Sequence, residues 1–132
     1  MYLVYILKSD DNKYYVGMTN NFLKRWMQHN KYIKGGARYT NKRTYWTPVC
    51  IIDGFNNKSE AMKCEWVLKT RKTKLSKKYN GTFGRILYLN ELLKNKKWTS
   101  TSEKIADQNL KIYIITLYKP YLDIDTRELE WF

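Results

Sequence analysis

Histidine, cysteine and proline are scarce in this 132-residue chain, and so are acidic residues. One histidine and two cysteines are too few for a structural zinc site or a disulfide framework. Cys50 lies in an apolar strand-like run and Cys64 on a helix face, so we favour buried free thiols over a redox role. No charged-then-apolar leader opens the sequence, and its longest apolar stretch, around Ile112–Tyr118, is too short to span a bilayer. We therefore expect a soluble, intracellular protein, in nucleus or cytoplasm.

Basic residues, in contrast, are abundant and unevenly placed. Residues 1–80 hold 17 Lys and Arg against 5 Asp and Glu, whereas residues 81–132 hold 8 against 7. This polarity indicates a polyanionic partner for the first two thirds of the chain. We favour nucleic acid over an anionic membrane, because no basic amphipathic helix with a clean apolar face is present. A protein that is merely basic and soluble is the alternative.

The pattern of apolar residues predicts an α+β fold with a small, mainly antiparallel, three-stranded sheet flanked by helices and followed by a C-terminal helix and strand. We expect a single domain in which residues 1–82 form the core and residues 83–132 form an extension packed on it. The expected elements are strands Tyr2–Lys8, Tyr14–Met18 and Tyr45–Asp53, a helix from Phe22, a helix from Asn57 to about Lys72, a helix Phe83–Lys94, a late strand Asn109–Tyr118, and an acidic surface tail Asp123–Glu130. Pro48 predicts that the third strand is an edge strand or carries a bulge.

Polar side chains meet where the first hairpin runs into the first helix. Tyr5 and Tyr15 lie on the two hairpin arms, so their phenols should reach the same region of the sheet. Gly17 favours a close approach of the second strand to another group. Arg25 and His29 are four residues apart and share a flank of the helix, beside an apolar stripe that includes Leu23. This arrangement is typical of an anion-binding surface, although two strand tyrosines can also be simple packing residues.

Two further segments carry candidate functional residues. The loop of residues 34–43 combines paired glycines with basic and aromatic residues, which suits either a phosphate-binding loop or an ordinary solvated loop. In the second helix, Glu65 falls within an apolar arc formed with Met62 and Trp66. A carboxylate there needs compensation by a metal ion, an arginine or water. Lys69, near the same arc, is either an ion-pair partner or a snorkelling cation.

These residues together resemble the GIY-YIG nuclease superfamily. The similarity rests on Val4-Tyr5-Ile6, Tyr15-Val16-Gly17, then Arg25 and His29 on one helix and Glu65 on the next. Gly-Gly-Ala-Arg-Tyr-Thr at residues 35–40, the segment 61–66, and the stretches around 85–87 and 97–99 resemble the SLX-type branch, the structure-specific endonucleases that cut branched DNA. The resemblance covers nearly the whole chain, with valine in place of a glycine and of an isoleucine in the two short motifs.

The resemblance implies a DNA endonuclease that leaves 5′-phosphate and 3′-hydroxyl ends and uses one divalent ion, Mg²⁺ or Mn²⁺, held by Glu65. A lone carboxylate is compatible with Mg²⁺, because waters and a substrate phosphate can complete its coordination. Arg25 would bind the scissile phosphate. Tyr5 would take a proton from water, directly or as a phenolate favoured by nearby cations, while His29 orients it or relays the proton and Tyr15 binds phosphate or water. Residues expected to grip flanking DNA are Arg38, Lys42, Arg43, Lys69, Arg71, Lys72, Lys74 and Asn80.

Partners follow from the same resemblance. The expected substrate is branched DNA, such as flaps and junctions. SLX-type proteins usually join a scaffold subunit through a C-terminal RING-like zinc module, and these 132 residues have no pattern that builds one. We therefore do not expect that scaffold partner, and we leave open whether two copies form a homodimer. The alternative functions are a non-catalytic nucleic-acid-binding module and a sequence-specific homing or restriction-type nuclease.

Overall fold

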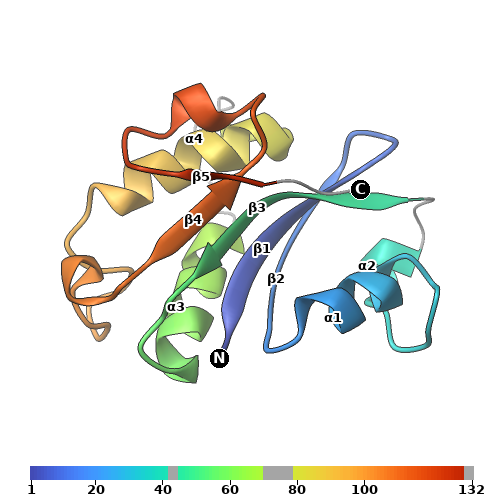
Figure 1. Ribbon diagram of the computed structural model, residues 1–132, viewed down its shortest axis with the longest axis horizontal. Helices are drawn as coiled ribbons and strands as arrows, with labels where there is room; N and C mark the ends of the chain where they lie inside the picture. Colours follow the sequence, from blue (N-terminus) through green and yellow to red (C-terminus); the bar gives the residue numbers. More distant parts are fainter. Residues whose placement is uncertain (42–44, 70–78, 130–132) are drawn as a thin grey trace.

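A computed structural model describes residues 1–41, 45–69 and 79–129 (Figure 1). Its α+β composition confirms the predicted fold class. The elements are β1 (Leu3–Ser9), β2 (Tyr14–Thr19), α1 (Phe22–His29), α2 (Arg38–Asn41), β3 (Trp46–Asp53), α3 (Lys58–Lys69), α4 (Gly81–Leu93), the 3-10 helix η2 (Ile105–Asp107), β4 (Lys111–Ile114), the 3-10 helix η3 (Lys119–Tyr121) and β5 (Arg127–Glu128).

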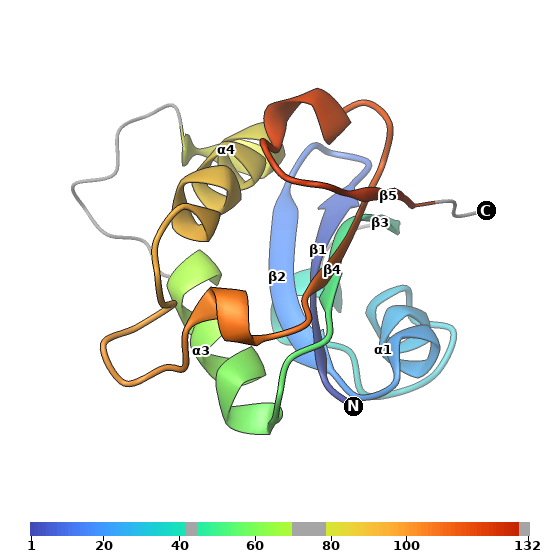
Figure 2. The same ribbon diagram turned by 60° about the vertical axis from the view of Figure 1, so that its left-hand side comes forward.

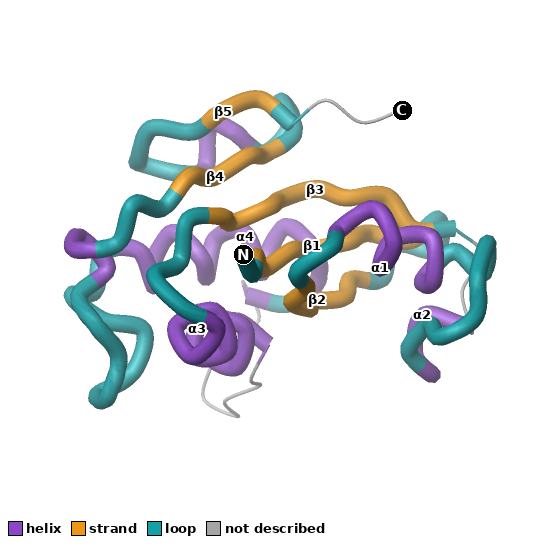
Figure 3. The backbone as a smooth tube through the Cα atoms, turned by 60° about the horizontal axis from the view of Figure 1, so that its bottom comes forward, coloured by secondary structure: helices purple, strands orange, loops and turns teal. Residues whose placement is uncertain are grey.

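The strands form one sheet in the order β2-β1-β3-β4-β5, which Figure 3 shows from bottom to top. Neighbouring strands are antiparallel except β4 and β5, which are parallel. The sheet has five strands rather than the predicted three, because the late strand pairs with β3 and part of the acidic tail pairs with β4. The register of β1 against β3 shifts beside Pro48, so the proline marks a bulge and not an edge.

Strand β1 is covered on both faces, as its continuous apolar sequence predicts. Val4 and Ile6 point into the larger core, which α3 and α4 complete. Tyr5 and Leu7 point the opposite way, into a smaller cluster that faces α1. Figure 2 shows the sheet between these two sets of helices. The side-chain period of two along a strand thus divides β1 between two environments.

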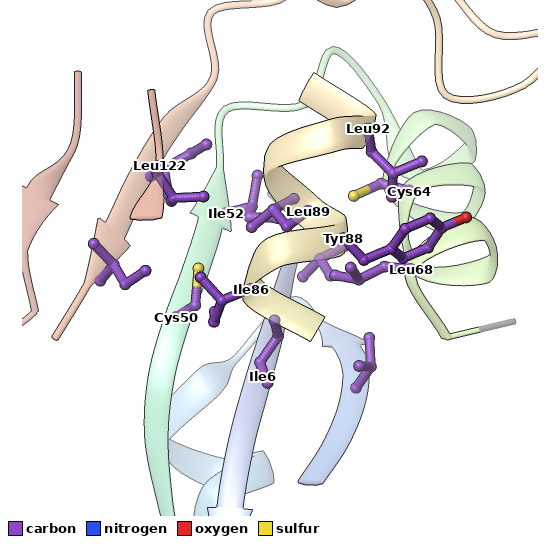
Figure 4. Close-up of a cluster of buried hydrophobic side chains, with 14 of the residues drawn as sticks. Ile6, Cys50, Ile52, Cys64, Leu68, Ile86, Tyr88, Leu89, Leu92 and Leu122 are labelled. Atoms are coloured by element: carbon purple, nitrogen blue, oxygen red, sulfur yellow. The ribbon is translucent and has the colours of Figure 1, made fainter. Parts of the chain in front are cut away.

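The larger core lies between the sheet and the pair α3 and α4. Figure 4 shows α4 residues Ile86 and Leu89 lying over Ile6 and Ile52 of the sheet. Both cysteines are buried free thiols within this core, as predicted. Burial raises the pKa of Cys50 to about 12 and raises the pKa of Cys64 as well. Both sulfurs are therefore protonated at neutral pH.

Helix faces differ from the predicted apolar stripes in several places. Leu23 of α1 and Met62 and Trp66 of α3 are exposed, although the sequence predicts each of them on an apolar face, and Phe83 of α4 is exposed as well. Each helix therefore buries a narrower arc than its apolar content suggests.

Two buried polar side chains fix α3, the helix that carries Glu65. At its first turn, the Glu60 carboxylate accepts hydrogen bonds from the Gln108 side-chain amide (3.0 Å) and the Glu103 backbone N–H (3.1 Å), and the Lys63 ammonium lies 3.3 Å away. At its last turn, the Arg85 guanidinium donates to the Leu68 carbonyl at 2.9 Å. Residues that follow α3 in the chain, Arg85 of α4 and the segment that includes Glu103 and Gln108, therefore hold both ends of α3.

No helix within the described parts of the chain combines the length and the apolar character needed to cross a membrane.

Candidate active site

The β1–β2 hairpin places two phenols on the face of the sheet that α1 covers. Tyr5 is directly opposite Gly17, and Tyr15 is opposite Leu7, so the tyrosines are diagonal neighbours with ring centroids 6.4 Å apart. A Cβ atom at position 17 would lie 2.4 Å from the Tyr5 hydroxyl oxygen. The predicted close approach at Gly17 is thus made by the Tyr5 ring, and only glycine leaves room for it.

Helix α1 brings the histidine beneath these rings. The Asn21 side chain caps the helix by accepting from the Lys24 N–H at 3.1 Å, as the sequence predicts. His29, at the last turn, is fully buried. Its Nε2 is 2.7 Å from the Tyr5 hydroxyl oxygen, and its ring centroid is 4.8 Å from that of Tyr15.

A hydrogen-bonded chain behind His29 determines which of its nitrogens carries the proton. The Thr40 hydroxyl donates to the Ala37 carbonyl at 2.9 Å, so towards His29 Nδ1, 2.9 Å away, it acts as an acceptor. Nδ1 must then carry the hydrogen, which leaves Nε2 as an acceptor for the Tyr5 hydroxyl. The proton of Tyr5 therefore points at His29, and its oxygen lone pairs face elsewhere.

Burial dominates the protonation of this pair. Burial, and the neighbouring Tyr15, raise the pKa of Tyr5 well above its usual value, and Arg25 lowers it by less. Burial, together with the positive charge of Arg25, lowers the pKa of His29 to about 4. In the free protein Tyr5 is thus a neutral phenol and His29 a neutral imidazole. The expectation of a standing phenolate favoured by cations is wrong, because desolvation outweighs the cationic surroundings.

Arg25 is oriented before any substrate arrives. Its Nη1 donates to the Gly35 carbonyl at 2.8 Å and to the Gln28 side-chain oxygen at 2.9 Å. Gly35 has a φ of 110°, and a Cβ there would lie 2.7 Å from the Gln28 side-chain nitrogen. The loop after α1 therefore requires glycine at this position, and one of its carbonyls holds the guanidinium.

Glu65 reaches the same region from α3, which packs along β2 on the other side of the sheet. The negative charge of Glu65 raises the pKa of Tyr5, as Tyr15 does, whereas Arg25 lowers it. Glu65, Tyr15 and Arg25 therefore all lie within electrostatic range of the Tyr5 hydroxyl. Glu65 is half-buried, while Met62 and Trp66 on either side of it are exposed. It therefore lies at the border of the apolar arc and not, as expected, within it.

The remaining predicted residues lie around this group or outside the described residues. Arg38 begins α2, and Asn80 is the residue before α4; both side chains are exposed. The Lys69 ammonium lies 5.5 Å from the centroid of the Tyr15 ring, one helical turn beyond Glu65. The other predicted DNA contacts, Lys42, Arg43, Arg71, Lys72 and Lys74, fall outside the described residues.

Sequence reasoning missed several residues that support the site. Thr40 fixes the His29 tautomer, and Gln28 helps to hold Arg25. Asn30 joins the end of α1 to β3, because its side chain accepts from the Trp46 N–H at 2.6 Å and donates to the Trp46 carbonyl at 3.0 Å. The only signal for Thr40 was its place in the 35–40 motif. For Asn30, the only signal in the sequence was that it directly follows His29.

The ligand types near Glu65 limit which ion could bind. Within the described residues, no three or more His, Cys, Asp or Glu side chains gather as a metal-binding group. A single half-buried carboxylate does not suit zinc, which takes three or four protein ligands. It does suit Mg²⁺, which keeps several waters and commonly takes one or two carboxylates plus substrate phosphate.

Comparison with known proteins matches residues 1–80 to the GIY-YIG catalytic domain. The chain is 46% identical over 59 residues to the structure-specific endonuclease subunit SLX1 homolog of Giardia intestinalis, a match that covers 43% of this chain and 16% of that protein. It is 38% identical over 79 residues to structure-specific endonuclease subunit SLX1 of Podospora anserina, covering 57% and 23%. It is also 38% identical over 98 residues to the UPF0213 protein YsiG of Lactococcus lactis, covering 72% and 82%. The match thus spans about a fifth of the two endonuclease subunits and most of the third relative.

Proposed function

Because the chain belongs to the GIY-YIG family, we propose that it is a divalent-metal-dependent endonuclease that hydrolyses phosphodiester bonds in branched DNA and leaves 5′-phosphate and 3′-hydroxyl ends. One observation carries this proposal: the Tyr5–His29–Thr40 hydrogen-bonded chain lies within electrostatic range of both Arg25 and Glu65. A base, a cation for the phosphate and a carboxylate for a metal ion are the parts that phosphodiester hydrolysis needs. The names of the two SLX1 relatives support the choice of substrate.

Arg25 binds the scissile phosphate in this mechanism. A guanidinium held by Gly35 and Gln28 is pre-organised, so little side-chain entropy is lost when the phosphate binds. It remains charged at any working pH, and it therefore stabilises negative charge that develops on the phosphoryl oxygens.

Tyr5 and His29 share the task of the general base. The attacking water gives a proton to the Tyr5 oxygen as the Tyr5 proton moves to His29 Nε2, so the phenol is never left as a phenolate. The low pKa of His29 opposes this transfer in the free protein. A bound phosphate brings negative charge close to Arg25 and offsets the effect of its positive charge, which raises the pKa of His29 when it must accept the proton.

In this proposal Glu65 is the metal-binding residue, and the ion that it holds lies beside the bound phosphate. When bound there, a divalent ion would supply charge that stabilises the phosphoryl and leaving oxygens. Tyr15, in contact with the ring of His29, orients the phosphate or the water. Arg38 and Lys69 contact the flanking backbone, and so do the basic residues between 42 and 74 that lie outside the described structure.

The test compares cleavage of a labelled linear duplex, a 5′-flap and a four-way junction, in Mg²⁺ or EDTA, by wild type and Glu65→Gln. We expect cleavage of the branched DNAs only in Mg²⁺, and none by Glu65→Gln, which should still bind DNA in a gel-shift assay. Glu91→Gln, an exposed glutamate on α4, is the matched control and should cut normally. Normal cutting by Glu65→Gln overturns the metal assignment. Cutting of one sequence in linear duplex favours a homing-type enzyme, and binding without cutting favours a binding module.

A further inference from the structure

A pocket next to the active site remains without a role in the mechanism above. It has a volume of about 300 Å³ and lies along β2, the edge strand of the sheet. Its lining residues are Tyr14, Tyr15, Val16, Tyr39 and Lys69. It is therefore a small cavity with three phenol rings and one cation, and it shares Tyr15 with the active site.

The rings of this pocket are arranged to receive a flat molecule. The Tyr15 and Tyr39 rings are nearly parallel, with 25° between their planes and 6.4 Å between centroids. The centroid of the buried Trp46 ring lies 6.0 Å from that of Tyr39 and 6.4 Å from that of Tyr15, and the buried Arg85 guanidinium lies 5.3 Å from the centroid of the Tyr14 ring. A planar group that stacks on one of these two rings is thus also close to parallel with the other.

The charge at the pocket wall points to a nucleotide. The Lys69 ammonium is 5.5 Å from the Tyr15 ring centroid and one helical turn from Glu65, on the same face of α3. A phosphate group bound by Lys69 would therefore lie next, along the DNA backbone, to the scissile phosphate whose metal ion Glu65 is proposed to hold. Aromatic rings beside a phosphate-binding cation are the features with which proteins hold unpaired bases.

On these grounds, and resting on the proposed function, we propose that the pocket binds one unpaired nucleobase next to the scissile phosphate, stacked on Tyr39 and Tyr15, with its phosphate on Lys69. A base in continuous duplex is paired and stacked, and removing it from the helix sacrifices that pairing and stacking, whereas a base at a branch point is already free. The pocket thus selects branched DNA through stacking, without reading sequence, since every base has a π-face.

The test places 2-aminopurine, a fluorescent base that stacking quenches, at single positions around the branch of a 5′-flap DNA. Measurements in EDTA prevent cleavage. We expect wild type to quench one position beside the branch, and Tyr39→Leu to abolish that quenching and weaken binding on the order of 10-fold, while Tyr39→Phe retains both. Tyr121→Leu is the matched control, because Tyr121 is 43% exposed and Tyr39 41% exposed. It should behave as wild type.

An abasic residue at the quenched position provides the second arm. The abasic DNA should bind wild type more weakly than normal DNA does, by about the same factor as Tyr39→Leu weakens binding to normal DNA. The Tyr39→Leu variant should bind abasic and normal DNA equally well. If the abasic site lowers the affinity of Tyr39→Leu by the same factor as that of wild type, the two changes act independently and the base-binding role is overturned. DNA binding with no quenched position would overturn it as well. Quenching without cleavage in Mg²⁺ would overturn the nuclease and leave the pocket assignment intact. No binding to any DNA would overturn both.

Discussion

The two faces of the sheet are built from neighbouring residues but from different chemistry. The face towards α3 and α4 is a continuous apolar core in which even the thiols stay protonated. On the face towards α1, the buried apolar cluster consists, among the residues that the structure describes, of Tyr5, Leu7 and Trp46. A chain of hydrogen bonds through His29 and Thr40 lies beside it. Alternate residues of β1 thus face the apolar core on one side of the sheet and the proposed active site on the other.

Because the two faces differ in chemistry, substitutions on them should change different properties of the protein. Residues of the apolar face should change the free energy of unfolding and leave the rate per folded molecule unchanged. Residues of the polar face should change the rate or its pH dependence, because their hydrogen bonds orient reacting groups. Each prediction below tests one side of this division.

The largest effect is expected for Ile6→Ala, on the apolar face. Ile6 is fully buried, and a cavity left by truncation should lower the free energy of unfolding by about 2–5 kcal/mol. Urea denaturation measures the loss, and cleavage at saturating DNA, corrected for the folded fraction, should match wild type. A rate change larger than about 3-fold per folded molecule would show that the two faces are coupled.

Arg25→Ala should have the largest effect on the polar face. Loss of one pre-organised charge-stabilising group should slow cleavage on the order of 10²–10³-fold, because the phosphoryl charge then develops without a cation. The urea midpoint should stay near that of wild type, since Arg25 is only half-buried. Arg25→Lys is the control for charge alone: it should recover a minor part of the rate, as an ammonium lacks the guanidinium geometry. An unchanged rate in Arg25→Ala removes it from the mechanism.

Much of this division was visible in the sequence. The continuous apolar run of β1 predicted a strand buried on both faces, and the spacing of Tyr5, Tyr15, Arg25 and His29 predicted that these residues gather. Asn21 and Asn57 are of a residue type that favours helix N-caps, and in the structure the side chains of both accept a hydrogen bond from a backbone N–H group.

What the sequence could not provide depends on long-range contacts. Leu23 and Met62 look like core residues on a helical wheel, yet they are exposed, since burial depends on which elements pack against the helix. The phenolate expectation for Tyr5 failed for a related reason: nearby cations can be counted in a sequence, whereas desolvation depends on the packed structure. Thr40 acts on His29 across 11 residues, and no local periodicity reports such a bond.

The next effect is a pH dependence of stability, and it can be followed at the one histidine of the chain. The pKa of His29 falls from 6.5 to about 4 on folding, so between these values the unfolded state binds the proton and the folded state does not. Above pH 6.5 His29 is neutral in both states, so it causes no change of stability with pH there. As the pH falls from 6.5 to about 4, the unfolded state binds a proton that the folded state does not, and this lowers the free energy of unfolding by up to about 3 kcal/mol. NMR titration of the single imidazole should give a midpoint near pH 4, and His29→Gln should show a shallower loss of stability over this range. A midpoint near 6.5 would contradict the buried neutral imidazole.

Thr40→Val should have the smallest effect and is the most specific test of the polar face. Valine keeps the shape of threonine but removes the hydroxyl that accepts from His29 Nδ1 and donates to the Ala37 carbonyl. Without it, His29 is no longer held in the tautomer that accepts the Tyr5 proton, and cleavage should slow by roughly 5–30-fold, the equivalent of about 1–2 kcal/mol for one hydrogen bond.

Thr40→Ser separates this role from packing, because serine restores the hydroxyl while leaving a small void. If Thr40 acts through His29, the serine variant should cut within about 3-fold of wild type although it is the less stable of the two. The ¹⁵N shifts of the imidazole should report the Nδ1–H tautomer in wild type and Thr40→Ser, and a mixture in Thr40→Val. Equal rates for valine and serine would mean that Thr40 merely fills space, and the polar face would then end at His29.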